Sequence, residues 1–492
     1  EARTRENITI MTNSQVAAIF SDGKAGIYQD REDRYIHVSF GGLIVATGAR
    51  ERSLIFPGND LPGVFGAGAF QTLVNRDLVK SSERVLIVGC GNVGLIGAYH
   101  ALQAGIEVVG LLDIAPKVTG YKVHADKIKR MGVPIYLNHT LIGVQGDGKV
   151  EKATIAQVDE NWNPLVETAR TFAVDTVLIA VGLSSADEFY DAAVEGGFPV
   201  LKTGDANEIA EASSAMMGGR IVGREMAGLL GSEVSTPQEW FEKAQILKSH
   251  PGEVFSRSYS LPKENGWEPM IHCYEEIPCN PCTTVCPHDS IHLSGLTGTI
   301  MDIPEFSGQC IGCGLCVLIC PGLAITLVRR SKENGKAEVI VPHEFNHDYG
   351  PGDQVILRDP SGTNIGEGTV KATRYNKKHR THLITLEVAA HLATQVVGIL
   401  VQDEKVTKPL TETDFTYLPD NAVVCRCERV TVGEIKAFVR DNNVTDLNQL
   451  KIPRVAMGAC GGKTCLDLVP RVLMQAGVKR EDIHPATHRP LM

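Results

Sequence analysis

Residues 84–95 read Arg84-Val-Leu-Ile-Val-Gly-Cys-Gly-Asn-Val-Gly-Leu95, and this stretch decides the fold of the chain's first half. An apolar strand runs into the glycines Gly89, Gly91 and Gly94, and a helix should follow them. A second apolar strand then ends at Asp113. This order of strand, glycine turn, helix and strand predicts a parallel α/β unit that binds a dinucleotide. The pyrophosphate would lie at the helix N-terminus, and Asp113 would contact a ribose.

Two alternatives remain open for this unit. The glycines could serve packing alone, and ATP or another adenine nucleotide would satisfy the same geometry as NAD. The acid at the end of the second strand favours NAD over NADP. Cys90 is a lone thiol inside the turn, and we interpret it as structural.

Two similar apolar segments flank this unit, Leu43-Ile-Val-Ala-Thr-Gly48 and Val177-Leu-Ile-Ala-Val-Gly182, and Gly204-Asp205 follows the second. With these segments the chain resembles the two-dinucleotide-domain flavoprotein reductases, the pyridine nucleotide-disulfide oxidoreductase superfamily. The resemblance implies that Gly48 lies where the chain leaves an FAD domain. It also implies that Gly204 and Asp205 bind FAD, with the Asp205 carboxylate on the ribityl chain.

The same resemblance divides the first half into an FAD-binding domain at 1–52 and 172–245, interrupted by an NAD-type domain at 53–171. Residues 208–228 should form a helix under the flavin. The chain departs from the family at its start, because residues 1–40 read as strands from the middle of an FAD domain and the usual FAD fingerprint is absent. We therefore expect FAD to be completed by a missing segment or by another chain.

Twelve of the thirteen cysteines fall into two groups with the short, fixed spacings of iron–sulfur ligands. Within the first group, Val285-Cys-Pro-His-Asp-Ser-Ile-His-Leu293 and Ile319-Cys-Pro-Gly-Leu-Ala-Ile-Thr-Leu327 repeat at an offset of 34 residues. The first group is Cys273, Cys279, Cys282, Cys286, Cys310, Cys313, Cys316 and Cys320, and the second is Cys425, Cys427, Cys460 and Cys465.

The repeat makes residues 246–335 resemble a bacterial dicluster ferredoxin. In that pattern the fourth cysteine ligates the other cluster, so the resemblance implies two [4Fe–4S] clusters with exchanged ligands. One set would be Cys286, Cys310, Cys313 and Cys316, and the other would be Cys273, Cys279, Cys282 and Cys320. The second set has a long gap after Cys273, so a site with three ligands or structural zinc stays open there.

Residues 336–415 alternate apolar and polar positions between turns, which predicts a small β-barrel or sandwich. The basic run from Arg374 to Arg380 should be a solvated hairpin tip, with partner docking as the alternative. Residues 416–492 resemble the [2Fe–2S] domain of bacterioferritin-associated ferredoxin, and zinc is the alternative to the two-iron cluster. A capping box at Thr431 and Glu434 predicts a helix, and a second helix should follow Cys465.

Composition and charge exclude several classes of protein. The 492 residues suggest three or four domains, and the formal charge of −10 argues against nucleic acid as a main partner. No apolar run reaches the length of a membrane span, and no leader is visible. Because cysteines with metal-ligand spacing indicate a reducing compartment, we expect a cytoplasmic protein.

The whole chain therefore combines an α/β flavoprotein scaffold, an α+β dicluster ferredoxin domain, a small β domain and a small helical [2Fe–2S] domain. This combination resembles the alpha subunit of heteromeric FAD-dependent amine and amino-acid dehydrogenases, such as dye-linked proline dehydrogenase, opine oxidase, hydrogen cyanide synthase and sarcosine oxidase. The resemblance implies an electron-transfer subunit whose partner flavoprotein subunit oxidises the substrate. A ferredoxin, NAD or a quinone-linked carrier would be the acceptor.

Two other functions stay open. A self-sufficient NAD(P)H:ferredoxin-type oxidoreductase would take hydride at the glycine turn, although it would need its own flavin. A scaffold with redundant clusters is the non-catalytic alternative, and the intact ligand sets argue against it. No general base, nucleophile or oxyanion group stands out, so the catalytic residues are unknown. His272, His288 and His292 lie beside cluster cysteines, where we expect them to pack or to tune potential.

Overall fold

The structure is a computed structural model of the chain, and it describes residues 2–248, 250–262, 266–402, 408–409, 419–457, 465–466 and 468–484. The chain forms two compact units. The first unit comprises residues 1–50, 183–248 and 484–492, and the second comprises residues 51–182 and 249–483. Within the described ranges, no helix has both the length and the apolar character that crossing a membrane requires.

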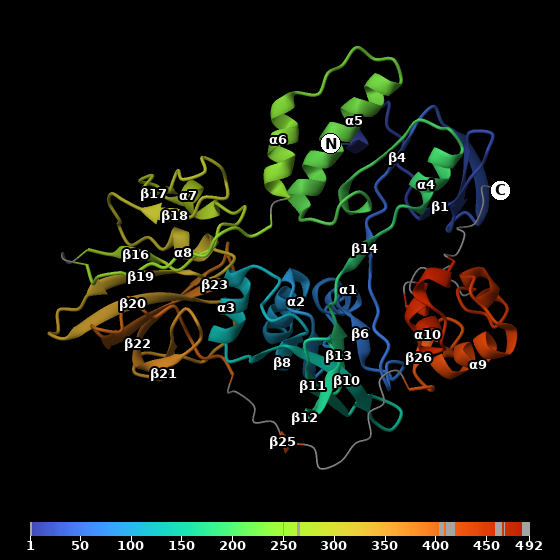
Figure 1. Cartoon of the computed structure of the whole chain (residues 1–492). Helices are drawn as coiled ribbons and strands as arrows, with labels where there is room; N and C mark the ends of the chain where they lie inside the picture. The colour runs from blue at the N-terminus through green and yellow to red at the C-terminus, as the bar shows by residue number, and fades with distance from the viewer. Residues whose placement is uncertain are drawn as a thin grey trace. The chain divides into compact units, whose positions relative to one another are not determined.

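The described part of the first unit contains small sheets and three α-helices (Figure 1). Its main elements are β1 (Ser14–Ile19), β2 (Lys24–Gln29), β3 (Arg34–Ser39), β4 (Leu43–Val45), α4 (Glu188–Glu195), β15 (Val200–Lys202), α5 (Ala212–Leu229) and α6 (Gln238–Leu247). Strands β1–β3 are antiparallel, whereas β4 and β15 form a parallel pair. Helix α5 begins where the Glu211 carboxylate accepts hydrogen bonds from two backbone N–H groups, and it packs on α6 through Met217, Ile221 and Ala244. Two short strands, β5 (Ala49–Glu51) and β14 (Leu183–Ser185), pair where the chain passes between the units.

The second unit contains a five-stranded parallel sheet in the order β6-β13-β7-β8-β9. The strands are β6 (Val64–Gly66), β7 (Arg84–Val88), β8 (Glu107–Asp113), β9 (Ile135–Leu137) and β13 (Thr176–Ile179). The helices that accompany this sheet are α1 (Ala67–Gln71), α2 (Asn92–Gln103) and α3 (Lys122–Arg130). This is the predicted strand, glycine turn, helix and strand, so the predicted α/β fold class is confirmed.

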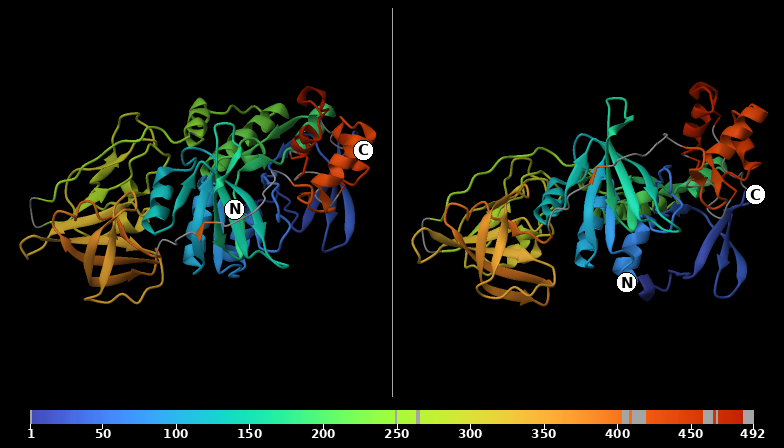
Figure 2. Two further views of the ribbon diagram at one scale, coloured as in Figure 1. Left: turned by 60° about the horizontal axis from the view of Figure 1, so that its bottom comes forward. Right: turned by 90° about the horizontal axis from the view of Figure 1, so that it is seen from below.

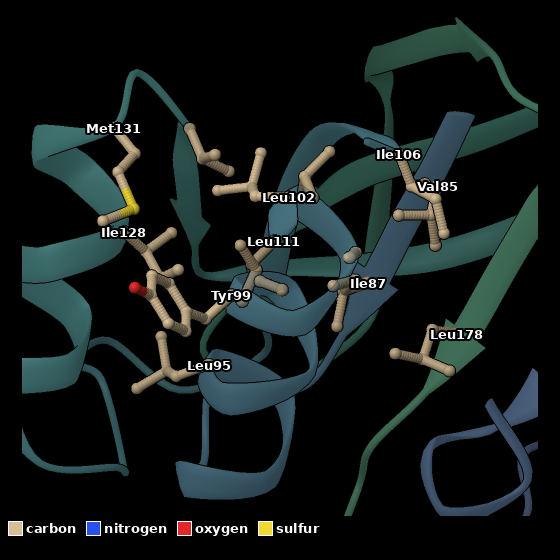
Figure 3. Close-up of a cluster of buried hydrophobic side chains, with 14 of the residues drawn as sticks. Val85, Ile87, Leu95, Tyr99, Leu102, Ile106, Leu111, Ile128, Met131 and Leu178 are labelled. Carbon is tan, nitrogen blue, oxygen red and sulfur yellow. The ribbon is translucent and has the colours of Figure 1, made fainter. Parts of the chain in front are cut away.

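Strand β7 is buried on both faces, as a parallel strand between two layers must be. Val85 and Ile87 join one core cluster, and Leu86 and Val88 join another. Figure 3 shows the first cluster, in which Tyr99 of α2 points toward α3. The second cluster is closed by the antiparallel strands β10 (His139–Gln145), β11 (Lys152–Val158) and β12 (Pro164–Ala173), to which β25 (Lys408–Pro409) pairs.

The cysteine-rich segment repeats in structure as it does in sequence. Its elements are β16 (Glu268–Ile271), α7 (Pro281–Val285), β17 (Ile291–Leu293), β18 (Pro304–Phe306), α8 (Leu315–Ile319) and β19 (Ile325–Arg330). Helix α8 follows α7, and β19 follows β17, at the same offset of 34 residues that the sequence shows. Each half is therefore a loop, one turn of helix and a strand.

The strands of the predicted small β domain join β19 in one seven-stranded antiparallel sheet. They are β20 (Lys336–His343), β21 (Gln354–Arg358), β22 (Asn364–Asn376), β23 (Thr381–Ala389) and β24 (Gly398–Ile399). The sheet order is β16-β19-β20-β23-β22-β21-β24, and Figure 2 shows its strands in yellow and orange from two further directions. The basic run occupies the end of β22 and the exposed turn before β23.

The tail is a small helical module with β26 (Val423–Cys425), β27 (Val430–Thr431), α9 (Val432–Asn442) and α10 (Val469–Gln475). The predicted capping box is confirmed, because Thr431 Oγ1 accepts from the Glu434 N–H at 3.2 Å and the Glu434 carboxylate accepts from the Thr431 N–H at 2.7 Å. The second predicted helix, α10, begins four residues after Cys465.

Candidate cluster and nucleotide sites

Four cysteines from both halves of the repeat line one pocket. Cys310 and Cys313 lie on the loop before α8, Cys316 lies on α8, and Cys286 follows α7. Gly312 and Gly314 take φ values of 72° and 79°, which lets the loop turn tightly enough to bring three sulfurs to the same cavity. Most of the other wall residues are apolar, and His288 and Gln309 also line the pocket. A pocket with four thiols and mostly apolar walls fits a [4Fe–4S] cluster.

The other four thiols of the first group, those of Cys273, Cys279, Cys282 and Cys320, also lie close to one another. The pKa of Cys273 is raised to about 12, first by burial and then by the neighbouring thiols of Cys320, Cys279 and Cys282. Burial and the thiols of Cys320 and Cys279 raise the pKa of Cys282 to about 12 as well. Because a thiolate is the ligand form, thiols of this kind ionise when positive iron binds.

Backbone N–H groups donate to cysteine sulfurs at equivalent places in the repeat. The Ser290 N–H donates to Cys286 Sγ, and the Ala324 N–H donates to Cys320 Sγ, each with an N···S distance of 3.4 Å. Asp289 and Leu323, the residues just before these donors, both have a φ of 47°. The same left-handed turn therefore aims both N–H groups, and such bonds stabilise the thiolate ligand.

The third set of cysteines lies in the tail module. Cys425 ends β26 and is 1% exposed, Cys427 is exposed, and Cys465 is 1% exposed. Cys460, the fourth expected ligand, lies outside the described residues. The guanidinium of Arg426, between the first two cysteines, donates to the Asn59 carbonyl oxygen at 2.7 Å. Among the described residues, no three His, Cys, Asp or Glu side chains are arranged to hold a single metal ion.

The glycine turn after β7 brings α2 very close to the sheet. A Cβ on Gly94 would lie 2.0 Å from the Gly89 carbonyl oxygen, and a Cβ on Gly89, whose φ is 110°, would lie 2.2 Å from that of Ala180. Gly91 is the N-cap of α2, and no described side chain caps the first turn. This arrangement fits a pyrophosphate at the positive end of α2.

The Asp113 carboxylate holds this turn in place. It accepts hydrogen bonds from the Cys90 N–H at 2.7 Å and from the Ala115 N–H at 3.0 Å. A carboxylate has about four acceptor positions, so it can still accept from a ribose hydroxyl. The Cys90 side chain is fully buried, and burial, followed by the charge of Asp113, raises its pKa to about 12, as suits a structural thiol.

The flavin residues expected from the resemblance belong to the first unit. Gly48 has a φ of 75°, and its carbonyl oxygen accepts from the Ala186 N–H at 2.9 Å. Gly204 has a φ of 60° and lies on the wall of a cavity of about 310 Å³ between β15, α5 and α6. The Asp205 carboxylate accepts from the Ala210 N–H at 3.4 Å. A cavity of this size is typical of cofactor sites, and the buried Thr203 hydroxyl in its wall has no hydrogen-bond partner among the described residues.

Sequence reasoning missed two cations beside the second thiol set. Lys127 and Arg130 of α3 are each 4% exposed. Lys127 Nζ donates to the Pro321 carbonyl oxygen at 3.1 Å, and the Arg130 guanidinium donates to that of Gly322 at 2.9 Å. Both acceptors lie just after Cys320. A Lys-x-x-Arg pair on a helix ordinarily predicts a solvated face, so the sequence carries no signal for this contact.

Three parts of the chain match models of known domain families. Residues 1–207 match the pyridine nucleotide-disulphide oxidoreductase family. Residues 306–326 match the 4Fe-4S binding domain, and residues 423–475 match the BFD-like [2Fe-2S] binding domain. These matches support FAD, NAD, [4Fe–4S] and [2Fe–2S] as the cofactors.

Several curated proteins are similar to parts of the chain. Hydrogen cyanide synthase subunit HcnB of Pseudomonas aeruginosa is 26% identical over 281 residues, covering 49% of this chain and 58% of that protein. The ferredoxin–NAD(+) reductase subunit of the benzene 1,2-dioxygenase system of Pseudomonas putida is 29% identical over 189 residues, covering 37% of this chain and 42% of that protein. Sarcosine oxidase subunit alpha of Rhizobium meliloti is 28% identical over 254 residues, covering 51% of this chain and 21% of that protein. The chain thus matches between a fifth and three fifths of the length of these relatives.

Among solved structures, the L-proline dehydrogenase from P. horikoshii aligns with 99% of this chain and 64% of its own chain, at 14% identity and a TM-score of 0.48. The family matches and the curated relatives agree on the class of protein. The chain joins a region similar to flavoprotein oxidoreductases to iron–sulfur binding domains, and it resembles the subunits of hydrogen cyanide synthase and sarcosine oxidase.

Proposed function

We propose that this chain is the electron-transfer subunit of a multisubunit dehydrogenase that oxidises an amino acid, an imino acid or a related amine. The observation that carries the proposal is the pair of four-thiol sets, since two cluster sites in one folded segment form a path for single electrons. The similarity to HcnB and to sarcosine oxidase subunit alpha supports an amine or amino-acid substrate for the assembly. A partner flavoprotein subunit would carry the substrate site.

The chain's own residues hold and insulate the redox groups. Clusters, when bound, accept and release one electron at a time without gaining or losing bonds to substrate. The cysteine thiolates anchor them, backbone N–H groups from Ser290 and Ala324 stabilise two of those thiolates, and buried apolar side chains keep water away. Gly89, Gly91, Gly94 and Asp113 would hold an adenine dinucleotide. Gly48, Gly204 and Asp205 would hold part of FAD, and another chain or segment would complete that site.

Purification from the native source tests this proposal directly. We expect the chain to copurify with a flavoprotein subunit, and two [4Fe–4S] and one [2Fe–2S] cluster predict about ten irons per chain. Replacing one ligand by Cys313→Ala should remove about four of them. The matched control is Cys90→Ala, which removes a buried thiol outside every ligand set and should keep all the iron. A native chain that is monomeric, or that holds only one metal ion per thiol set, contradicts the proposal.

The second candidate function is an NAD(P)H-dependent reductase that works without a partner. The glycine turn and the similarity to the ferredoxin–NAD(+) reductase subunit favour it. Anaerobic addition of NADH to the isolated, cofactor-loaded chain separates the two functions. Bleaching of flavin and cluster absorbance by NADH alone would support the reductase. If bleaching requires the partner subunit and its amine substrate, the electron-transfer subunit is supported.

A further inference from the structure

Helix α3 inserts two cations into the contact between the nucleotide-binding sheet and the cluster segment. Lys127 donates to the Pro321 carbonyl oxygen, and Arg130 donates to those of Gly322 and Leu323, at 2.9 to 3.2 Å. The Lys127 ammonium also lies over the Tyr99 ring, 3.6 Å from its centroid. Figure 3 shows Tyr99 reaching from α2 toward α3. The turn that both cations hold begins at Cys320, a ligand of the second thiol set.

The carboxylates of Glu344 and Asp126 act on Lys127 and Arg130, respectively, from beyond ion-pair distance. Among the described residues, no acidic side chain lies within ion-pair distance of Lys127 or Arg130. The nearby acids have other partners, because Asp126 pairs with Lys122 at 2.7 Å and Glu344 accepts from the hydroxyls of Tyr99 and Thr381. Two unpaired buried cations would be strongly destabilising. The Cys320 thiol lies close enough to act on both cations, so its thiolate would add negative charge beside them once a cluster is bound.

The first thiol set lies in a different electrostatic environment. The Arg374 guanidinium donates to the carbonyl oxygen of Cys313 in this set at 3.1 Å. Arg374 is exposed, whereas Lys127 and Arg130 are buried. Salt and water screen an exposed charge strongly and a buried one weakly. The two cluster sites should therefore differ in how strongly the protein stabilises added negative charge.

We propose that Lys127 and Arg130 raise the reduction potential of the cluster at Cys273, Cys279, Cys282 and Cys320 above that of its neighbour. Reduction adds one electron and no proton, so the reduced form carries one more negative charge. The two buried cations stabilise that form over the oxidised one. An electron is therefore more stable on the cluster beside the nucleotide-binding sheet than on the neighbouring cluster. This inference depends on the cluster loading in the proposed function.

A redox titration of the cluster-loaded chain, followed by electron paramagnetic resonance, tests the inference. Cys279→Ala and Cys313→Ala assign the two [4Fe–4S] signals, since each removes a ligand of one set. Lys127→Gln and Arg130→Gln keep a hydrogen-bond donor but remove the charge. We call the signal that is lost in Cys279→Ala the Cys279 signal, and the one that is lost in Cys313→Ala the Cys313 signal. Each charge-removing variant should shift the midpoint potential of the Cys279 signal to a lower value and leave that of the Cys313 signal unchanged. The charge-preserving Lys127→Arg should keep the wild-type midpoint, and Arg374→Gln should leave the Cys279 signal unmoved.

Unchanged midpoints in Lys127→Gln and Arg130→Gln chains with full iron content would overturn the inference, because the cations would then only join two parts of the fold. If these variants do not fold, a salt titration of the wild-type chain decides. We expect the midpoint potential of the Cys279 signal to change less than that of the Cys313 signal as ionic strength rises. An equal or larger change would contradict the inference. Absence of iron at the second thiol set in the wild-type chain would instead count against the proposed function.

Discussion

Asn59 ties the tail module to the nucleotide-binding region through one buried amide. The side chain is 2% exposed, Nδ2 donates to the Val423 carbonyl oxygen at 2.8 Å, and Oδ1 accepts from the Val423 N–H at 3.3 Å. The carboxylate of the next residue, Asp60, pairs with Arg429 at 2.6 Å. The buried amide matters more than the ion pair, because an exposed pair contributes little.

Asn59→Ala should destabilise this contact by about 1–3 kcal/mol, because it removes a buried hydrogen bond to each backbone group of Val423. Hydrogen exchange of the tail amides should then become roughly 5- to 150-fold faster. Asn421→Ala is the matched control, since Asn421 is exposed in the same segment. If both variants exchange at the same rate, the contact does not hold the tail.

Gly94 permits the close approach of α2 to the glycine turn. A Cβ at this position would lie 2.0 Å from the Gly89 carbonyl oxygen, which belongs to rigid backbone. Gly94→Ala should therefore push α2 away from the sheet, lower the melting temperature and abolish NADH binding measured by calorimetry. Gly219→Ala in α5 is the control, since a Cβ there meets nothing within 4 Å and should stabilise its helix by up to about 1 kcal/mol. Wild-type binding by the Gly94 variant would contradict the role of this glycine.

At the scale of elements, strands β20 and β23 and the segment that follows β20 bring three histidines together. The ring centroids of His343 and His347 are 5.1 Å apart, and those of His347 and His382 are 4.4 Å apart. Burial, followed by the charges of His347 and His382, lowers the pKa of His343 to about 3. The three histidines pack as neutral aromatic rings, and His343 lies beside Phe345 and Tyr349.

This pKa predicts a loss of stability in acid. Above pH 6.5 His343 is neutral in both the folded and the unfolded chain, so it adds no pH dependence. Between about pH 6.5 and 3 the unfolded chain binds a proton that the folded chain does not, so stability falls as the pH falls. Between pH 7 and 5 the loss should be roughly 2 kcal/mol. Hydrogen exchange in β20 and β23 should show this loss in the wild-type chain and less of it in His343→Phe; an equal loss in both excludes His343 as the cause.

Much of the fold was predictable because its signals are local. The spacing of Gly89, Gly91 and Gly94 predicts a turn that only glycine permits, and the repeat at 34 residues predicts two equivalent halves. The pairing of β19 with β20 was not predicted, because the alternating pattern of a strand does not indicate which other strand it pairs with. The inward-facing Lys127 and Arg130 were also missed, since only the packed partner tells which face of a helix is buried.

At the scale of the whole molecule, iron should stabilise the second unit beyond the cluster loops. Removing iron leaves Lys127 and Arg130 buried beside neutral thiols, because the pKa values of Cys273 and Cys282 are raised to about 12 without metal. Buried cations that lose a nearby counter-charge favour opening of the contact that contains them. Chelation should therefore loosen α3 as well as the turn after Cys320.

Hydrogen exchange before and after anaerobic chelation measures this effect. We expect the amides of α3 and of residues 320–324 to exchange faster in the iron-free chain, and reconstitution with iron and sulfide should reverse the change. Helix α5, which belongs to the first unit and holds no cluster cysteine, serves as the internal control. In Lys127→Gln the difference should shrink, because less unpaired charge remains when the iron leaves. If exchange in α3 is the same with and without iron, the negative charge of the cluster does not hold this helix, and packing alone explains the contact.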